Sequence, residues 1–563
     1  MIYHCEDHTC NYWDEGEKLP ERCPQCGRKL LRANEADMTG DDWTALGNTL
    51  WDAEASDKKR MVDCFRKAAY LGSAWGVCNL GICMEQGNGV EADPVQAFWL
   101  YQQAVEMGSL NAVCCLGVCY QYGIGTAPDA KQAAELYCKA AEYGSPRGQM
   151  LLAHAFHDGI GVEADAAEAV YWVRAAAYQR YGEGMHRLGV CYEYGDGVEQ
   201  NWERAVHWFR EAAESGVSVA MADLGYCYEK GCGVEQSWEQ AFSWYRRGAE
   251  CGYPVSMSNL GLCYKRGYGV EQNWQEAIKW YEQGAQCGHL QSMNNLACCY
   301  DGGEGVEQNE ERALYWYRRG AEAGSVYCMF YLGWNYSNGV GVKQNMTEAI
   351  RWYTAAAEGG NADAMHDLGW LYDHGEGVEQ DMKKAICWYE RAAEQNHPAA
   401  MNSLGECYAM GRGVPRDLET AMEWYRRAAE LGEAMADYNM GWHLEQAGKL
   451  SEAYAHYRKA ADGNDDSAWW ALGRFYENGV VVAQDGKEAR RCYETGEKLG
   501  SVKCKMRLAR CKLLGIGGRR AKNAGLDLCR QALELAKESS EKEDYGYEAE
   551  MNLLRRTIAE NES

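Results

Sequence analysis

The chain has 563 residues, of which 47% are hydrophobic and 25% are charged, and its formal net charge is −26. This composition excludes an intrinsically disordered protein, because it holds enough apolar material to bury a core. The length exceeds the roughly 100–200 residues of an ordinary domain, so a single compact core is not expected. The acidic balance disfavours general nucleic-acid binding, which depends on Lys and Arg neutralising phosphates.

The sequence predicts neither a targeting signal nor a membrane-spanning segment. Residues Met1 to Glu6 contain no cationic segment followed by an apolar run, so no signal peptide is predicted. A membrane-spanning helix needs about 18 consecutive apolar residues, and no stretch of the sequence approaches that length. We therefore expect a cytoplasmic protein that makes no contact with a membrane.

The chain opens with four cysteines in two close pairs, Cys5 with Cys10 and Cys23 with Cys26, the second pair within Cys-Pro-Gln-Cys-Gly. Two pairs of thiolates suit tetrahedral zinc. A segment of roughly 40 residues has little apolar mass for a core of its own, so a metal would supply folding energy. The pattern predicts a structural Zn²⁺ site in residues 1–38, which resembles a zinc ribbon or a rubredoxin-like finger.

Alternatives remain open for this metal-binding knuckle. His8 lies three residues after Cys5 and is an alternative ligand to Cys10. Iron is an alternative metal, because a rubredoxin site also has four cysteines, but it is less favoured than zinc. A segment without metal is the third alternative. The knuckle is either a cap on the first repeat or a docking module for a second partner.

The rest of the chain is dominated by one repeat. A Leu-Gly pair or a close variant occurs fourteen times, and the ten steps from Leu80 to Met440 are each 36 residues long. So strict a period predicts a solenoid rather than a globule. The leucine position is occupied by Leu46, Leu80, Leu116, Leu152, Leu188, Leu224, Leu260, Leu296, Leu332, Leu368, Leu404, Met440, Leu472 and Leu508.

Each repeat is predicted to form two antiparallel helices. In residues 218–252, apolar residues at helical spacing mark a first helix, Gly231 and Gly233 end it, and a second apolar stripe follows. Gly225 and Ala241 are small where the two helices should approach closely. A register of tryptophans is expected to fill the space between repeats; it comprises Trp172, Trp208, Trp244, Trp280, Trp316, Trp352, Trp388 and Trp424.

Seven cysteines also share one register, two residues after the repeat glycine. Neighbouring helices pack roughly 8–10 Å apart, whereas a disulfide needs Cα atoms within about 7 Å, so equivalent cysteines of adjacent repeats should not pair. We expect small buried residues in a reducing compartment. The register comprises Cys83, Cys119, Cys191, Cys227, Cys263, Cys299 and Cys407.

The repeat resembles the Sel-1-like family, a relative of the tetratricopeptide repeats. The resemblance is carried by an A-x-x-x-L-G-x-x-Y-x-x-G-x-G-V core, as in 220–234, and by the A-x-x-W-Y segment that follows it in 241–252. It implies an all-α, right-handed αα superhelical solenoid of about fourteen helix-turn-helix repeats over residues 41–515, with capping helices in 516–563. Members of this family, many of them bacterial, mostly act as protein-interaction scaffolds.

The partner-binding surface is predicted on the first helix of each repeat, which lines the concave face in the related families. One slot of this helix carries Tyr226 and, in later repeats, Trp334, Trp370 and Trp442. Aromatic anchors, amides that bond a peptide backbone and acids that select Lys or Arg would together capture an extended, basic peptide. The alternative is that these residues pack between neighbouring first helices. The neighbouring slot includes Asn294, Asn402, Tyr438 and Trp470, and the next slot includes Glu193, Glu229, Asp301, Asp373, Glu445 and Glu477.

A basic segment lies near the C-terminus. Residues 503–530 hold nine Lys or Arg and one acid, Asp527. In so acidic a chain this asymmetry suggests docking to an acidic partner or self-association with another copy, and a solvated capping helix is the alternative.

Catalysis is not predicted. The G-x-G-x-x-A runs at 87–92 and 159–164 recur as the loop between the two helices, without the strand that a dinucleotide fingerprint requires. We therefore expect a protein-interaction scaffold. Two alternatives are a β-lactamase-like hydrolase, by family association, and a metal-knuckle adaptor that docks to nucleic-acid machinery.

Overall fold

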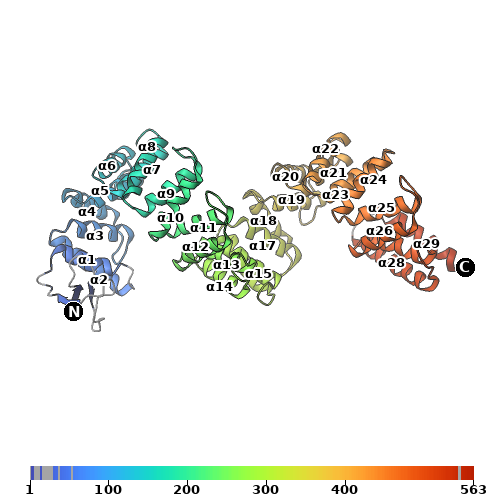
Figure 1. Ribbon diagram of the computed structural model, residues 1–563, viewed down its shortest axis with the longest axis horizontal. Helices are drawn as coiled ribbons and strands as arrows, with labels where there is room; N and C mark the ends of the chain where they lie inside the picture. Colours follow the sequence, from blue (N-terminus) through green and yellow to red (C-terminus); the bar gives the residue numbers. More distant parts are fainter. Residues whose placement is uncertain are drawn as a thin grey trace. The chain divides into compact units, whose positions relative to one another are not determined.

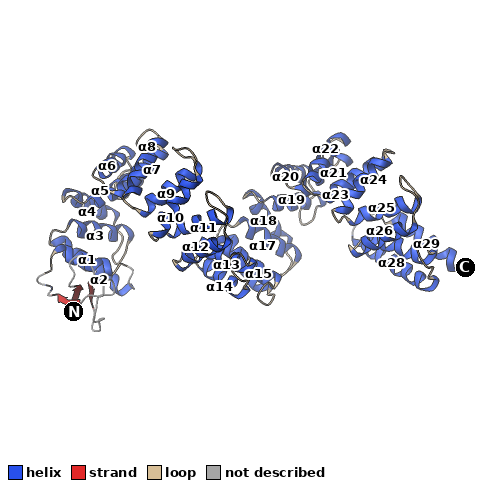
Figure 2. Ribbon diagram, in the orientation of Figure 1, coloured by secondary structure: helices blue, strands red, loops and turns tan. Residues whose placement is uncertain are grey.

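The structure is a computed structural model that describes residues 2–5, 13–15, 30–33, 35, 38–51, 55–542 and 547–562. Three short strands precede the helices (Figure 2): β1 (Ile2–Cys5), β2 (Trp13–Glu15) and β3 (Leu30–Ala33). They form an antiparallel sheet in the order β2-β1-β3. None of the helices among the described residues is long and apolar enough to cross a membrane.

The predicted helix pairs are confirmed. The first helix packs on the second helix of its own repeat from α1 with α2 to α13 with α14, and from α17 with α18 to α27 with α28 (Figure 1). The chain divides into two compact units, Met1–Ser292 and Met293–Ser563. The helices of the first unit are α1 (Gly40–Thr49), α2 (Ala55–Tyr70), α3 (Ala74–Gln86), α4 (Pro94–Glu106), α5 (Leu110–Tyr122), α6 (Ala130–Glu142), α7 (Pro146–Asp158), α8 (Ala166–Tyr178), α9 (Gly182–Tyr194), α10 (Trp202–Glu214), α11 (Ser218–Lys230), α12 (Trp238–Glu250), α13 (Pro254–Arg266) and α14 (Trp274–Gln286).

The second unit continues the same pattern, so that α1 to α28 make fourteen pairs, and one further helix, α29, packs on α27 and α28. Its helices are α15 (Leu290–Gly302), which begins at the end of the first unit, α16 (Glu310–Glu322), α17 (Val326–Asn338), α18 (Met346–Glu358), α19 (Ala362–His374), α20 (Met382–Glu394), α21 (Pro398–Met410), α22 (Leu418–Glu430), α23 (Ala434–Gln446), α24 (Leu450–Asp462), α25 (Asp466–Asn478), α26 (Gly486–Lys498), α27 (Val502–Leu514), α28 (Lys522–Lys542) and α29 (Glu548–Glu562).

Local sequence explains where the helices begin and end. Asn201 caps α10, because its side chain accepts a hydrogen bond from the Arg204 amide. Gly231 ends α11 in the left-handed region, with φ 74°, as the sequence predicted. Gly233, with φ 68°, lies against the backbone of Trp202 in the preceding repeat, where a Cβ atom would collide. The loop between helices is therefore also a contact between repeats.

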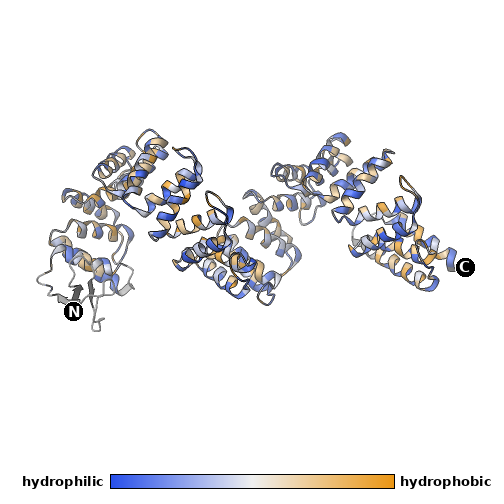
Figure 3. Ribbon diagram, viewed as in Figure 1, coloured by the Kyte–Doolittle hydropathy of each residue, from blue (hydrophilic) through white to orange (hydrophobic). Residues whose placement is uncertain are grey.

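A buried aromatic ring, most often that of tyrosine, fills the centre of most repeats. Tyr245 is fully buried on α12 and its ring lies against Gly225 of α11, where a Cβ atom would stand 2.5 Å from the ring. The tryptophan register, predicted to fill the space between repeats, lies one residue earlier on the same helices: Trp244 is buried, and the other seven tryptophans are half-buried. The reason is that one residue along a helix turns a side chain by about 100°. Hydrophobic and hydrophilic residues accordingly alternate along the helices in Figure 3.

The seven cysteines in register are buried, as expected. Burial raises the pKa of Cys191 to about 11 and that of Cys227 to about 12. They are small core residues of the first helices.

Candidate partner-binding face

The first helices of successive repeats lie side by side. Contacts between α3 and α5, between α5 and α7, and between α25 and α27 show this in both units. Side chains that point outward from these helices therefore share one surface within each unit.

Three tryptophans of the second unit lie on this surface. Trp334 on α17, Trp370 on α19 and Trp442 on α23 are 39%, 37% and 38% exposed. They occupy the same slot of their helices, so we call these three residues the tryptophan face. Between α19 and α23 the slot holds Glu406 of α21, which pairs with Arg412 at 3.6 Å.

Histidine rings pack against two of these three indoles. His374 stacks on Trp370 with ring centroids 4.2 Å apart, and His443 meets Trp442 edge-on at 4.7 Å. The Asn338 amide donates to the backbone carbonyl of Trp334 at 2.9 Å. An indole that is already packed on one side loses less conformational freedom when a ligand covers the other.

Tyr226 lies in the first unit, on α11, and is exposed. Lys230 lies over its ring at 5.9 Å. Because it belongs to the other unit, nothing in the structure brings it together with the tryptophan face.

The two predicted amides join first helices to one another. Asn402 is only 5% exposed; it accepts a hydrogen bond from Asn439 of α23 at 3.0 Å and donates one to Glu406 at 3.2 Å. Asn294 of α15 accepts from the Cys328 thiol of α17 at 4.0 Å. These amides lie between helices, the alternative that the sequence left open.

Several acids of the next slot are also engaged inside the chain. Glu229 accepts from the buried Tyr245 hydroxyl at 2.9 Å. Asp373 is buried and pairs with Arg412 at 2.9 Å. Glu445 pairs with Arg474 at 2.8 Å. Such carboxylates join helices within a repeat or between repeats, and these three do not supply a separate row of charges for a basic peptide.

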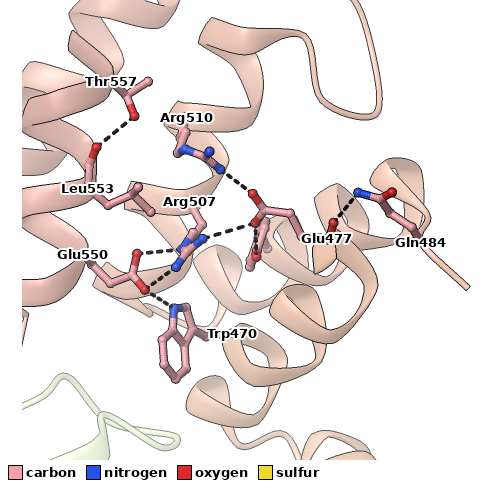
Figure 4. Close-up of polar contacts among 9 residues, drawn as sticks. Trp470, Glu477, Gln484, Arg507, Arg510, Glu550, Leu553 and Thr557 are labelled. Atoms are coloured by element: carbon pink, nitrogen blue, oxygen red, sulfur yellow. Dashed lines mark hydrogen bonds and ion pairs between the residues drawn. The ribbon is translucent and has the colours of Figure 1, made fainter. Parts of the chain in front are cut away.

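Glu477 belongs to a larger cluster at the C-terminal end (Figure 4). Arg507 of α27 lies between two carboxylates: it contacts Glu550 of α29 with two nitrogens, at 2.6 and 2.7 Å, and Glu477 of α25 at 3.3 Å. The Trp470 indole donates to Glu550 at 3.2 Å, and Arg510 pairs with Glu477. Sequence reasoning missed Glu550, because no periodicity links it to the repeat.

This cluster changes the interpretation of the basic segment. Arg507 and Arg510 are held by carboxylates of the same chain. Lys503 lies over the rings of Trp470 and Tyr547, at 5.3 and 5.7 Å, and burial lowers its pKa. Part of the segment thus fixes α29 and is not offered to a partner.

The predicted metal ligands lie mostly outside the described residues. This applies to His8, Cys10, Cys23 and Cys26, whereas Cys5 is the last residue of β1. Elsewhere in the described part of the chain, no group of three or more His, Cys, Asp or Glu could hold a metal ion.

The strand register places Cys5 at one end of the sheet. Cys5 pairs with Leu30 at the start of β3, and His4 pairs with Trp13 at the start of β2. The end of β1 and the starts of β2 and β3 therefore meet at one end of the sheet. In the sequence, Cys10 precedes β2 by three residues and Cys26 precedes β3 by four.

The Sel1 repeat matches twelve consecutive segments of the chain. The chain belongs to the Sel1 repeat family. The matches start at α3 and stop after α26, so the first and fourteenth helix pairs and the N-terminal segment lie outside them. The matched residues are 76–109, 112–145, 146–181, 182–217, 218–253, 254–289, 290–325, 326–361, 362–397, 398–433, 434–465 and 468–501.

Two solved structures of this kind are similar to the chain. A protective antigen present in uropathogenic Escherichia coli strains is 28% identical, with a TM-score of 0.56, and the match covers 76% of this chain and 94% of the antigen. A Sel1 repeat protein from Oxalobacter formigenes is 29% identical, with a TM-score of 0.40, and the match covers 43% of this chain and 96% of that protein. No curated protein matches the chain. Sel1-repeat solenoids are typically protein-interaction scaffolds.

Proposed function

We propose that this Sel1-repeat protein is a scaffold that binds a protein or peptide on the first-helix surface of its second unit. The observation that carries the proposal is the tryptophan face: three partly exposed indoles in one slot of three first helices, two of them packed against a histidine ring. Tryptophan is enriched among the residues that dominate binding energy at interfaces.

The spacing of the helices suggests the form of the ligand. Packed helices lie roughly 8–10 Å apart, and an extended chain advances about 3.3 Å per residue. Apolar side chains about three residues apart would therefore meet Trp334 and Trp370, and a third about six residues further would meet Trp442. The net charge of −26 favours a basic ligand through long-range attraction.

Replacing Trp334 and Trp370 together with Ala should abolish binding without unfolding the chain. Peptides selected from a displayed library against the full-length protein provide the ligand, and fluorescence anisotropy measures the affinity. Because buried aromatic anchors contribute about 2 kcal/mol or more, we expect at least about a thirtyfold loss.

Tyr315 on the second helix α16 provides the matched control. It is exposed in the same unit but lies on the other helix layer, so Tyr315→Ala should leave the affinity unchanged. Equal losses in both variants, or full binding by the double tryptophan variant, would remove the proposal. Binding that persists unchanged at high salt would contradict the attraction of a basic ligand.

We also propose that Cys5, Cys10, Cys23 and Cys26 bind one zinc ion, with His8 as the alternative to Cys10; the sheet register described above supports this. Full-length protein purified without chelator should contain about one equivalent of zinc by mass spectrometry. Cys23→Ser should lose the metal, whereas Cys251→Ser, at an exposed cysteine on the solenoid, should retain it. Less than half an equivalent in the unaltered chain would refute the site.

No observation in the described part of the chain favours the β-lactamase-like hydrolase or the nucleic-acid adaptor, and neither is proposed. Cytoplasmic location and self-association remain predictions from the sequence.

A further inference from the structure

Three successive first helices of the first unit bring two thiols and a guanidinium together. Cys78 lies on α3, Cys115 on α5 and Arg147 on α7. The 36-residue period makes Cys114, not Cys115, the equivalent of Cys78 in the next repeat. Cys115 is therefore turned by about 100° from that equivalent position, and this offset allows the contact that cysteines in register cannot make.

The Cys115 sulfur has an unusual environment for a buried cysteine. It is 5% exposed and Cys78 is 1% exposed. The Arg147 guanidinium donates to the Cys115 sulfur at 3.6 Å, and the same nitrogen is held by the Asn111 side chain at 3.0 Å. Cys78 belongs to the same buried core cluster as Cys115. A nearly buried sulfur that accepts a hydrogen bond from a cation is stabilised as a thiolate.

The two sulfurs are accordingly driven apart in acidity. The hydrogen bond from Cys78 lowers the pKa of Cys115 against the effect of burial, and the positive charge of Arg147 lowers it further, while the Glu85 carboxylate opposes this. The same hydrogen bond and burial raise the pKa of Cys78. On the same two helices, burial alone raises the pKa of Cys83 to about 11, and burial with the nearby Glu85 raises that of Cys119 to about 12.

We propose that Cys115 and Cys78 form a peroxide-reactive thiol pair, in which Cys115 is the attacking thiolate, Cys78 the resolving thiol and Arg147 a positioning residue. The Cys115 thiolate attacks one oxygen of hydrogen peroxide; the O–O bond breaks, and Cys115 sulfenic acid and hydroxide form. The hydroxide takes the proton of Cys78 and becomes water. The Cys78 thiolate then attacks the Cys115 sulfur, an S–S bond forms and hydroxide leaves. Each sulfur loses one electron, and the peroxide gains two.

Size and position support this substrate class. A nearly buried sulfur admits a small oxidant more readily than a bulky disulfide such as glutathione disulfide. Helices α3 and α5 are already in contact, so a disulfide between them requires only a local shift. The product would be a covalent link between the first helices of two successive repeats, and it would remove the thiolate that Arg147 contacts.

The test compares cysteines within one sample of the folded full-length protein. The chain is exposed to hydrogen peroxide for increasing times, unfolded in the presence of an alkylating agent and digested without reductant, and peptide mass spectrometry follows each cysteine. We expect a Cys78–Cys115 crosslinked peptide to appear while Cys83 and Cys119 stay reduced. Because these two controls lie on the same helices, unfolding would expose all four together. Oxidation of the pair no faster than of the controls would overturn the proposal.

Two variants separate the roles. Cys78→Ser should stop the reaction at Cys115 sulfenic acid, which dimedone traps, and should leave no crosslink. Arg147→Met should slow oxidation of Cys115 by about tenfold or more relative to Cys119 in the same digest, because the stabilising cation is gone. An unchanged ratio in Arg147→Met, with the fold confirmed by circular dichroism, would show that the guanidinium does not activate the thiol.

Discussion

Arg507→Met is expected to destabilise the C-terminal end of the second unit by about 3–5 kcal/mol, because it removes one partner of a buried ionic cluster. Glu550 is 6% exposed and takes two hydrogen bonds from Arg507, and Glu477 takes a third. Without the guanidinium, Glu550 keeps only the Trp470 indole as a donor among these contacts. Hydrogen exchange should show early loss of protection in α29 and α27, with the helices of the first unit unchanged.

An exposed ion pair of the same unit supplies the control. Arg426 pairs with Glu423 and Glu430 on the surface of α22, where such pairs contribute about 0–1 kcal/mol. Arg426→Met should therefore leave exchange in α22 almost unchanged. A second variant, Arg507→Met with Glu550→Gln, should recover part of the loss, because one unpaired charge is gone. Equal effects of Arg507→Met and Arg426→Met would contradict the buried cluster.

Gly225→Val is expected to destabilise the repeat formed by α11 and α12 by about 1–3 kcal/mol, because the added side chain meets the ring of Tyr245. Intrinsic helix propensity alone predicts that Gly225→Val stabilises the helix, since Gly is the poorer helix former by up to about 1 kcal/mol. The measurement is the local opening free energy of these two helices by hydrogen exchange. An unchanged or higher value would show that the ring moves aside freely.

The chain itself suggests the compensating variant. In the repeat at Leu152, Ala153 stands in the glycine slot and Val173 in the tyrosine slot, so the larger residue on one helix faces a smaller one on the other. Gly225→Val combined with Tyr245→Val should therefore lose less than the sum of the two single changes. Strict additivity would mean that the two side chains do not compete for the same space.

The helix pairs could be predicted because their determinants are local. The apolar stripe through Leu224, the glycine that ends α11 and the 36-residue period all act within one repeat. Helical spacing does not show which of two adjacent aromatic residues lies at the centre of the core. Trp244 and Tyr245 are adjacent and both aromatic, and only the packed helices show that the tyrosine position is the centre of the core.

The candidate binding face was predicted in part for the same reason. Helical spacing placed the tryptophan face on the outer side of the first helices, where it lies. The same spacing could not tell that Asn402 is buried against α23, because that contact depends on how one repeat is rotated against the next.

By itself, the sequence determined a solenoid of helix pairs, since each pair's hydrophobic stripe and end signals are encoded within one period. Only the tertiary structure decided which polar and reactive side chains meet. Arg507 and Glu550 are 43 residues apart, and Cys78 and Cys115 are one residue out of register, so neither contact follows from the repeat. The physical reason is that rotation and stacking between repeats, which no single repeat encodes, set the distances between such side chains.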